Sequence, residues 1–180
     1  MPGIAAGSDS APELKPMAVR FGGTPCRVRL LHAGDEGRLQ AFFKSHTPET
    51  IKERYGFQIS EMSRERASEL VAVDQTRDLA VGIFAGSGRA EKIHAVGRYC
   101  LEQGGKSAEA AFVVRESMRN RGMATALLRI LVATARRRGL RALWGEVNPD
   151  NAPMLHLFRR NGFVLGRDPL TGGVRATLVL

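Results

Sequence analysis

The sequence lacks several features that mark specialised classes of protein. It has only two cysteines, Cys26 and Cys100, which lie far apart and outside any CxxC or histidine-paired spacing. That pattern favours neither a disulfide framework nor a metal site, so no metal is expected. No apolar stretch approaches the length of a membrane span, so no membrane partner is expected. The first residues have neither the charged start nor the apolar core of a signal peptide, which makes the cytoplasm the expected location.

Nucleic-acid binding also lacks support in the sequence. There is no basic stripe interleaved with aromatic residues, and no zinc-finger or RNP-like segment. The formal net charge of +9 nevertheless calls for an anionic partner, because a positive field of that size concentrates anions near the surface. A small molecule that carries phosphate groups would account for this charge as well as nucleic acid would.

Length and composition predict one globular domain. The 180 residues are enough for a single buried core, and 43% hydrophobic with 25% charged residues is ordinary for a soluble protein. Residues 1–23 are rich in Gly, Ala, Pro and Ser and have no sustained periodicity, which predicts a flexible N-terminal arm. The domain is therefore expected over residues 24–180, with no internal repeat or linker.

The spacing of apolar residues predicts an α/β fold. Strands are expected at about 26–31, 79–84, 92–101, 108–114, 142–147, 163–165 and 174–180. Helices are expected at about 34–45, 48–56, from 63, 122–139 and 151–161. Short turns join the second, third and fourth strands, so these three should form an antiparallel meander. Alternation along the third strand places Ile93 on the same side as Ala95 and Tyr99.

The stretch from Ala108 to Leu131 is typical of a buried strand, a tight turn and an amphipathic helix in direct succession. The first N–H groups of such a helix have no intrahelical partner and lie at the positive end of its dipole, so an anion is the natural ligand. Gly122 keeps the approach clear, and Arg119 and Arg121 add positive charge. Taken alone, the same residues also fit an ordinary glycine turn with solvated arginines.

Three segments in order resemble one known family. Residues 119–124, Arg-Asn-Arg-Gly-Met-Ala, are similar to the Q/R-x-x-G-x-G/A pyrophosphate-binding motif of the GNAT family of N-acetyltransferases. A glutamate-containing strand precedes them at the family's usual distance, and residues 146–151 with 161–163 are similar to the family's later motif. The matches cover about residues 107–164, and three in order are far more specific than one.

A closer resemblance, over residues 42–51, 111–115 and 145–149, is to the acetyltransferase domain of bacterial protein lysine acetyltransferases. It implies a single GNAT domain, with a central mixed, mostly antiparallel, twisted sheet of about six to seven strands flanked by helices. It also implies acetyl-CoA (coenzyme A) as co-substrate. The residues implied to bind it are Phe112, Val113, Val114, Arg119, Asn120, Arg121, Gly122, Met123, Ala124, Thr125, Asn148 and Asn151. Of these, Asn151 taken by itself fits better as the cap of the following helix.

The resemblance further implies direct transfer of acetyl from acetyl-CoA to a primary amine. The amine must lose a proton at pH 7, and Glu109 matches the family's general base. Burial beside the thioester would raise the pKa of Glu109 toward the useful range, whereas the alternative is an ordinary surface glutamate. The donor to the developing oxyanion is commonly a backbone N–H of the same strand, here Val114 or Val113.

One residue departs from the family pattern. Many members have a tyrosine in the last helix that returns a proton to the departing thiolate, and Phe158 stands at that position. Phenylalanine cannot donate a proton. Tyr99 or a water could substitute, or the thiolate could leave unprotonated, because a thiol pKa of about 8.5 makes it a fair leaving group.

The acceptor amine is the part of the function that the sequence determines least. A protein lysine is the first prediction, although the basic charge disfavours a lysine-rich acceptor surface. A small-molecule amine, such as a polyamine, an antibiotic or an amino acid, and a non-catalytic acyl-CoA-sensing module are the alternatives. Tyr55, Phe57 and Met62 are candidates either for the acceptor pocket or for the core. A monomer or homodimer is expected, and nucleic acid is not an expected partner.

Overall fold

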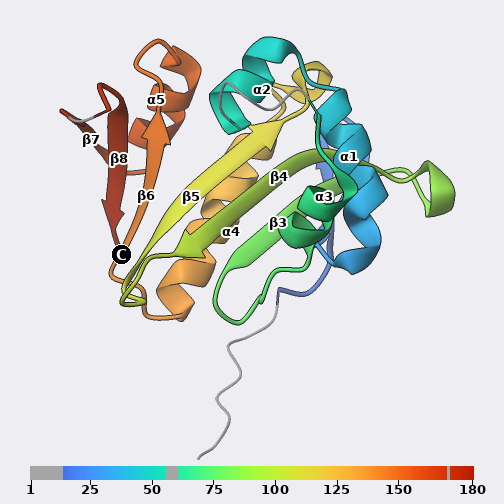
Figure 1. Cartoon of the computed structure of the whole chain (residues 1–180), viewed down its shortest axis with the longest axis horizontal. Helices are drawn as coiled ribbons and strands as arrows, with labels where there is room; N and C mark the ends of the chain where they lie inside the picture. Colours follow the sequence, from blue (N-terminus) through green and yellow to red (C-terminus); the bar gives the residue numbers. More distant parts are fainter. Residues whose placement is uncertain (1–13, 56–60, 170) are drawn as a thin grey trace, which may run out of the picture.

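An eight-stranded mixed sheet forms the centre of the computed structural model, which describes residues 14–55, 61–169 and 171–180 (Figure 1). The strand order is β1-β2-β3-β4-β5-β6-β8-β7, and every neighbouring pair is antiparallel except β5 with β6. The strands are β1 (Met17–Phe21), β2 (Thr24–Leu30), β3 (Leu79–Ala85), β4 (Lys92–Leu101), β5 (Ser107–Val114), β6 (Ala142–Val147), β7 (Val164–Arg167) and β8 (Val174–Val179). The predicted α/β fold is confirmed, with slightly more strands than expected.

Helices cover both faces of this sheet (Figure 1). One face packs against α4 (Met123–Arg137), and the other packs against α1 (Glu36–Lys44) and α3 (Arg64–Val71). The remaining helical elements are α2 (Pro48–Tyr55), α5 (Ala152–Arg160), η1 (Ala33–Asp35), η2 (Gly88–Ala90) and η3 (Glu116–Met118). Within the described residues, every helix is too short or too polar to cross a membrane.

Local sequence explains where several helices begin and end. The Ser63 hydroxyl accepts a hydrogen bond from the N–H of Arg66 at 3.1 Å and caps α3. The hydroxyl of Thr47 accepts from the N–H of Thr50 at 3.3 Å at the start of α2, where a proline holds the first helical position. Beyond the last turn of α4, Gly139 adopts the left-handed φ of 70° that ends many helices.

Strand β5 contributes to two separate apolar cores, because alternate side chains point to opposite faces of a sheet. Phe112 belongs to the core on the α4 side, together with Leu127 and Leu131. Its neighbour Val113 belongs to the core on the α1 side, together with Phe43. The central strand that leads to the predicted anion loop is therefore held from both sides.

The predicted N-terminal arm over residues 1–23 is wrong at its C-terminal end. Met17–Phe21 forms β1 and pairs along its whole length with β2, which adds a strand at the edge of the sheet. Backbone hydrogen bonding to β2 outweighs the Gly- and Pro-rich composition around this segment. The first part of the arm, residues 1–13, lies outside the described residues.

The expected alternation along β4 is also wrong at one point. Ile83 pairs with Ala95, whereas Phe84 pairs with Ile93, so His94 is an extra residue on β4. Because of such a β-bulge, the side chains before it point to the opposite face of the sheet from the one that simple alternation predicts. Ile93 therefore lies in the core on the α1 side, and Ala95 lies in the core on the α4 side.

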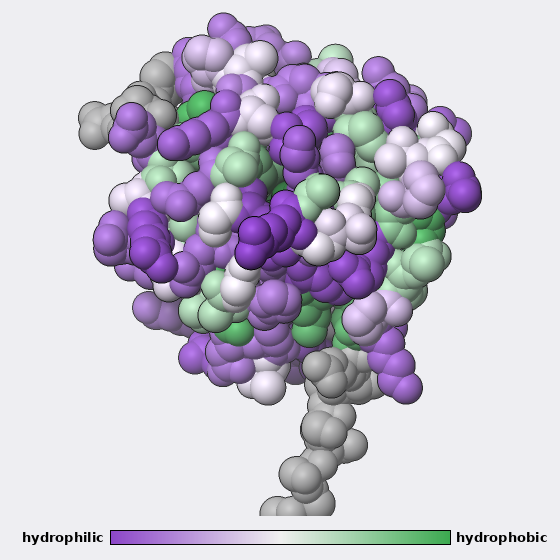
Figure 2. Space-filling view, turned by 90° about the vertical axis from the view of Figure 1, so that its right-hand side faces the viewer, coloured by the Kyte–Doolittle hydropathy of each residue, from purple (hydrophilic) through white to green (hydrophobic). Residues whose placement is uncertain are grey.

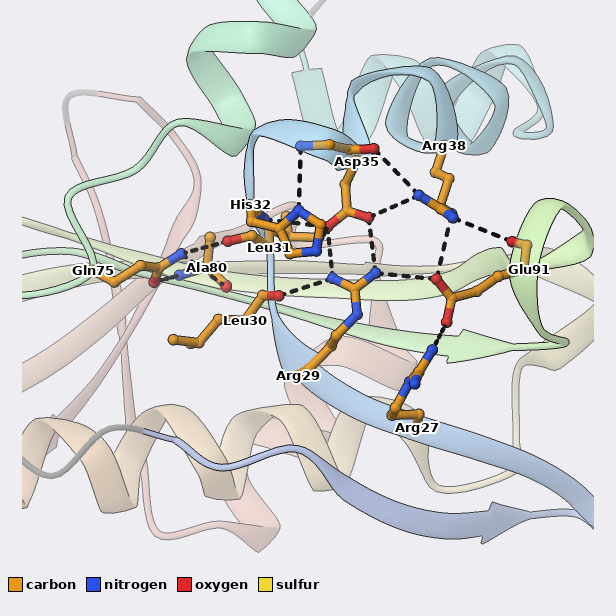
Figure 3. A network of polar contacts seen from close by, with 12 residues as sticks. Arg27, Arg29, Leu30, Leu31, His32, Asp35, Arg38, Gln75, Ala80 and Glu91 are labelled. Carbon is orange, nitrogen blue, oxygen red and sulfur yellow. Dashed lines mark hydrogen bonds and ion pairs between the residues drawn. The ribbon is translucent and has the colours of Figure 1, made fainter.

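A network of buried charges ties the start of α1 to the connection between β3 and β4 (Figure 3). Arg29 on β2 donates two hydrogen bonds, of 2.6 and 2.8 Å, to the fully buried carboxylate of Asp35. It also donates to Glu91 at 3.2 Å, and Glu91 is further paired with Arg27 and Arg38. Because Asp35 and Glu91 are buried, each carboxylate depends on its arginine partners.

The arginines hold the pKa values of the two carboxyl groups below their ordinary values. Burial raises the pKa of Asp35, but hydrogen bonds from Arg29 and from the N–H of His32 outweigh it, so the pKa lies below its ordinary value. Burial likewise raises the pKa of Glu91, and hydrogen bonds from Arg27 and Arg29 outweigh it. Lowered folded-state pKa values stabilise the fold above the unfolded pKa of about 4, and this stability is lost as the pH falls through the folded values.

The surface beside this network is mostly polar. Figure 2, which faces the side where α1 and η2 lie in Figure 1, shows mainly hydrophilic residues with apolar ones scattered among them. The apolar side chains Leu39, Phe42 and Phe43 of α1 are buried against the sheet instead. The helix is therefore amphipathic, as its apolar spacing predicts.

Asp35→Asn should lower the free energy of unfolding at pH 7 by about 1.5 to 3 kcal/mol, because it removes one of the two buried carboxylates that pair with Arg29 and leaves only Glu91. As the pH falls below about 4, the free energy of unfolding should also decrease less in the variant than in the wild type. Urea unfolding at pH 7 and pH 3 measures both effects. Asp150→Asn, at an exposed position, is the matched control. Wild-type stability in Asp35→Asn would contradict the role given to this network.

Candidate active site

Strands β5 and β6 pair over only three residues and then diverge. Their parallel register joins Ser107–Glu109 to Ala142–Trp144, whereas β4 stays paired with β5 to the end of that strand. At Gly145 the two strands are still close, because a Cβ atom there would lie 2.9 Å from the Ala110 carbonyl oxygen and from a ring carbon of Phe158. The second half of β5 therefore has a strand partner on its β4 side alone.

The peptide groups of Phe112 and Val114 face this divergence. Along an antiparallel pair, successive peptide groups alternate between bonding the neighbouring strand and pointing away from it. The N–H of Arg115 donates to the carbonyl of His94 at 2.8 Å, so the N–H of Val114 points away from β4 and that of Val113 points toward it. Both valines are oxyanion-donor candidates from the sequence, and the register favours Val114.

The chain turns sharply between β5 and α4. Asn120 has a φ of 59° and Gly122 a φ of 84°, both in the left-handed region that Gly and Asn tolerate best. A Cβ atom at Gly122 would meet nothing within 4 Å, so the space in front of the loop is open. Arg119 and Arg121 are both exposed beside it. The loop is thus positively charged and sterically accessible.

The N-terminus of α4 has no side-chain cap among the described residues, and its first turn carries no acidic residue. The N–H of Ala126 bonds to the carbonyl of Gly122 at 3.0 Å, so the N–H groups of Met123, Ala124 and Thr125 precede the first intrahelical bond. These donors and the helix dipole together favour an anion in front of the helix. The structure therefore brings the predicted pyrophosphate-binding residues to one place.

Four side chains connect this loop to the junction between α1 and α2. Nη2 of Arg119 donates to the hydroxyl of Thr50 at 2.7 Å and lies 3.6 Å from Glu116. Glu116 accepts from the N–H of Thr47 at 3.1 Å, and its carboxylate lies 3.1 Å from Nδ1 of His46. Nothing in the sequence motifs singles out this cluster, because its two halves lie about 70 residues apart in the chain.

The pKa values in this cluster differ from their ordinary values. Burial raises the pKa of Glu116, but hydrogen bonds from its own backbone N–H, from Thr47 and from Thr50 outweigh it and lower the pKa to about 2. Burial lowers the pKa of His46, and this outweighs the opposite effect of Glu116. A neutral imidazole that donates its Nδ1–H to an ionised carboxylate fits both shifts.

Glu109 lies on β5, opposite Trp144 of β6 and Cys100 of β4. Its side chain shares a face with that of Val113, which packs toward α1, so it lies on the face opposite α4. The side chain is exposed, so the burial expected for it is absent. The position does, however, keep its carboxylate accessible to a molecule that approaches from the α1 side.

The two asparagines after β6 are both engaged locally. Oδ1 of Asn151 accepts from the N–H of Met154 at 3.2 Å and caps α5, which is the alternative that the sequence favours for it. Oδ1 of Asn148 accepts from the N–H of Asp150 at 3.0 Å in the turn before that helix. The Asn148 side chain is exposed at the end of β6, beside the divergence.

Tyr99, the aromatic residue suggested in place of the missing proton donor, is far from the anion loop, and Phe158 is part of the core. Phe158 is buried, with its ring 5.6 Å from that of Phe112 and 4.7 Å from that of Phe163. Tyr99 is fully buried, and its hydroxyl lies 2.7 Å from Nη1 of Arg138, just past the C-terminus of α4. Because α4 is about 22 Å long at 1.5 Å per residue, Tyr99 lies at the end away from the anion loop. The suggestion of Tyr99 as the acid is therefore wrong.

The other sequence candidates belong to the core or lie outside the description. Met62 is buried in the core on the α1 side, which confirms the core alternative for it. Phe57 and the side chain of Tyr55 lie outside the described residues. In the residues that the structure describes, no group of three or more His, Cys, Asp or Glu side chains could hold a metal ion.

Comparisons with known proteins match this geometry. Residues 36–163 match the model of the Acetyltransferase (GNAT) family. An acetyltransferase of Pseudomonas aeruginosa is 28% identical over 145 residues, which cover 79% of this chain and 76% of that protein. The GNAT domain of S. lividans PAT has a TM-score of 0.81 at 27% identity, over 92% of this chain and 97% of that one. A ribosomal-protein alpha-N-acetyltransferase solved with coenzyme A shares the fold, with a TM-score of 0.68 and 17% identity over 91% and 98%.

A strand that diverges from its parallel neighbour, followed by an uncapped and positively charged helix start, fits the acyl-CoA-dependent transferases that these comparisons match. The chain belongs to the Acetyltransferase (GNAT) family, whose model matches well over half of it. It is an N-acetyltransferase that uses acetyl-CoA as its co-substrate.

Gly145→Ala should push β6 away from β5 and lower the free energy of unfolding by about 1 to 3 kcal/mol, because its new methyl group meets a backbone oxygen. Gly166→Ala on β7 is the matched control, since a Cβ atom there meets nothing within 4 Å. Thermal unfolding of both variants measures the difference. Equal stability of the two would show that the strands are not held as closely as described.

Proposed function

We propose that this protein transfers acetyl from acetyl-CoA to a primary amine by direct attack, with Glu109 as general base and a protein lysine as acceptor. The observation that carries the proposal is the open peptide group of Val114 next to the uncapped start of α4. Acetyl-CoA carries its thioester and its pyrophosphate at the two ends of the pantetheine arm, so it needs an anion site and an amide donor that are joined by an open path.

The residues around the divergence fit acetyl-CoA, which supplies an acetyl group activated as a thioester. The N–H groups of Met123–Thr125 and the charges of Arg119 and Arg121 would hold its pyrophosphate. The pantetheine arm would leave the loop along the open edge of β5 and bond its outward-facing peptide groups, as a neighbouring strand does. Asn148 lies on the β6 side of the same space and would bond the arm from there.

Val114 and Glu109 have separate parts in the transfer step. The N–H of Val114 would stabilise the negative charge that develops on the acetyl oxygen as the C–N bond forms and the C–S bond breaks. Glu109 would accept the proton that the amine loses. Five residues of β5 separate the two, which is about 16 Å at 3.3 Å per residue, so a chain of water molecules must carry the proton.

The departing thiolate receives no proton from an aromatic hydroxyl at the usual position, because Phe158 stands there. A thiol pKa of about 8.5 allows the thiolate to leave unprotonated and to take a proton from water afterwards. The Phe158 ring instead packs against Phe112, which helps to hold β5 where it diverges from β6.

A protein lysine is supported as acceptor by the resemblance of three segments to bacterial protein lysine acetyltransferases. The exposed position of Glu109 also supports it, because a large acceptor needs an accessible base. The net charge of +9 favours the second candidate, a small-molecule amine, since a lysine-rich protein surface would be repelled.

Glu109→Gln should lower kcat about 100-fold with little change in the affinity for CoA, because it removes the proton acceptor and leaves the anion loop intact. Release of the CoA thiol from acetyl-CoA, with a lysine-containing protein as acceptor, measures the rate. Glu102→Gln, at an exposed position just beyond β4, is the matched control. Wild-type turnover in Glu109→Gln would remove this residue from the mechanism.

Gly122→Asp should abolish CoA binding, because it puts a carboxylate and a strained φ where the pyrophosphate is expected. Titration calorimetry with CoA measures the loss. Gly172→Asp is the control, since Gly172 also has a positive φ, of 70°, and open space around it, but lies in the connection between β7 and β8. Retained affinity in Gly122→Asp would contradict the assignment of this loop.

The acceptor is tested by comparing thiol release with acetylated-lysine formation across a panel of polyamines, aminoglycosides, amino acids and lysine-containing proteins. We expect the highest kcat/KM with a protein acceptor. Turnover with a small amine alone would favour the second candidate instead.

A further inference from the structure

Arg119 is held by the protein on one side of its guanidinium group. Nη2 donates to the Thr50 hydroxyl at 2.7 Å and lies 3.6 Å from Glu116. The other nitrogens, Nε and Nη1, have no hydrogen-bond partner among the described residues. A guanidinium carries five N–H donors in a fixed plane, so fixing one nitrogen also fixes the direction of the others.

The groups that hold Arg119 are themselves well fixed. Thr50 is only 6% exposed, and its hydroxyl also contacts that of Thr47 at 3.3 Å. The side chain of His46 is fully buried, and its ring packs edge-on against Phe42 with centroids 4.5 Å apart. Thr50, Glu116 and His46 thus form a rigid anchor for Arg119. The Arg119 side chain itself is 49% exposed at the open loop.

The anchor joins two segments that have different tasks in the proposed reaction. Glu116 and Arg119 belong to the loop that precedes the anion-binding end of α4. Thr47 and Thr50 belong to the start of α2, whose Ile51 packs against the core on the α1 side of the sheet, the side toward which Glu109 points. A change in the position of either segment must therefore strain these contacts or break them.

We infer that Thr50 is a positioning residue for the co-substrate, which aims the unpaired N–H groups of Arg119 at the pyrophosphate, and that Glu116 supports it by locking the loop to the start of α2. This inference rests on the proposed function of the loop. Pre-orientation reduces the rotamer entropy that an arginine loses when it binds an anion. The same contacts link occupation of the anion site to the position of α2 on the acceptor side.

The inference predicts that the effect of Thr50→Val on CoA affinity depends on the presence of Arg119. Thr50→Val keeps the shape of the side chain and removes the hydroxyl, and it should weaken CoA binding about fivefold. Arg119→Met should weaken CoA binding about tenfold. In the Arg119→Met background, Thr50→Val should have no further effect beyond about 1.5-fold, because the group that it positions is gone. Titration calorimetry with CoA on the full chain measures all four affinities.

Two further variants separate positioning from folding. Thr50→Ser restores the hydroxyl and should bind CoA within twofold of wild type. Thr76→Val removes a hydroxyl that bonds Asp74 at 2.6 Å, far from the loop, and should leave CoA binding unchanged in both backgrounds. A Thr50→Val effect of the same size with and without Arg119, or no effect at all, would overturn the inference. Failure of the wild type to bind CoA would instead overturn the proposed function.

Discussion

The divergence of β5 from β6 is the constraint on which the rest of the site depends. Three residue pairs hold the two parallel strands together, and beyond them β5 has a neighbour only on the β4 side. Unpaired strand peptide groups in a sheet interior are costly unless a ligand or water bonds them. The close contact at Gly145 and the packing of Phe158 on Phe112 fix where the pairing stops. The position of the open peptide groups is thus set by packing.

Different helices pack on the two faces of the sheet around this opening. On one face, α4 packs its apolar stripe on the strands, and its N-terminus has no side-chain cap among the described residues and no acidic residue in the first turn. On the other, α1 and α3 leave the Glu109 end of β5 exposed. Arg29 ties the start of α1 to the sheet, and Glu116 ties the junction between α1 and α2 to the loop before α4. Ionic contacts therefore fix this face relative to the loop.

Much of this arrangement follows from the sequence, because apolar spacing and helix-capping residues act locally. The strand, loop and helix around Gly122 are such a case, and so is the cap at Asn151. Other features depend on distant partners that no local pattern contains. Met17–Phe21 becomes a strand only because β2 offers an edge, the bulge at His94 appears only in the register with β3, and Thr50 meets Arg119 across 69 residues.

The parallel pairing of β5 and β6 also affects the order in which parts of the chain fold. The strands β3, β4 and β5 are joined by short connections, whereas Glu109 and Trp144 come together only after all of α4 has crossed between them. Contacts of such sequence separation form late, since loop closure must precede the gain from packing. The apolar face of α4 should therefore control the rate at which the chain reaches its native state, and the acetyl-CoA site should be among the last parts of the protein to form.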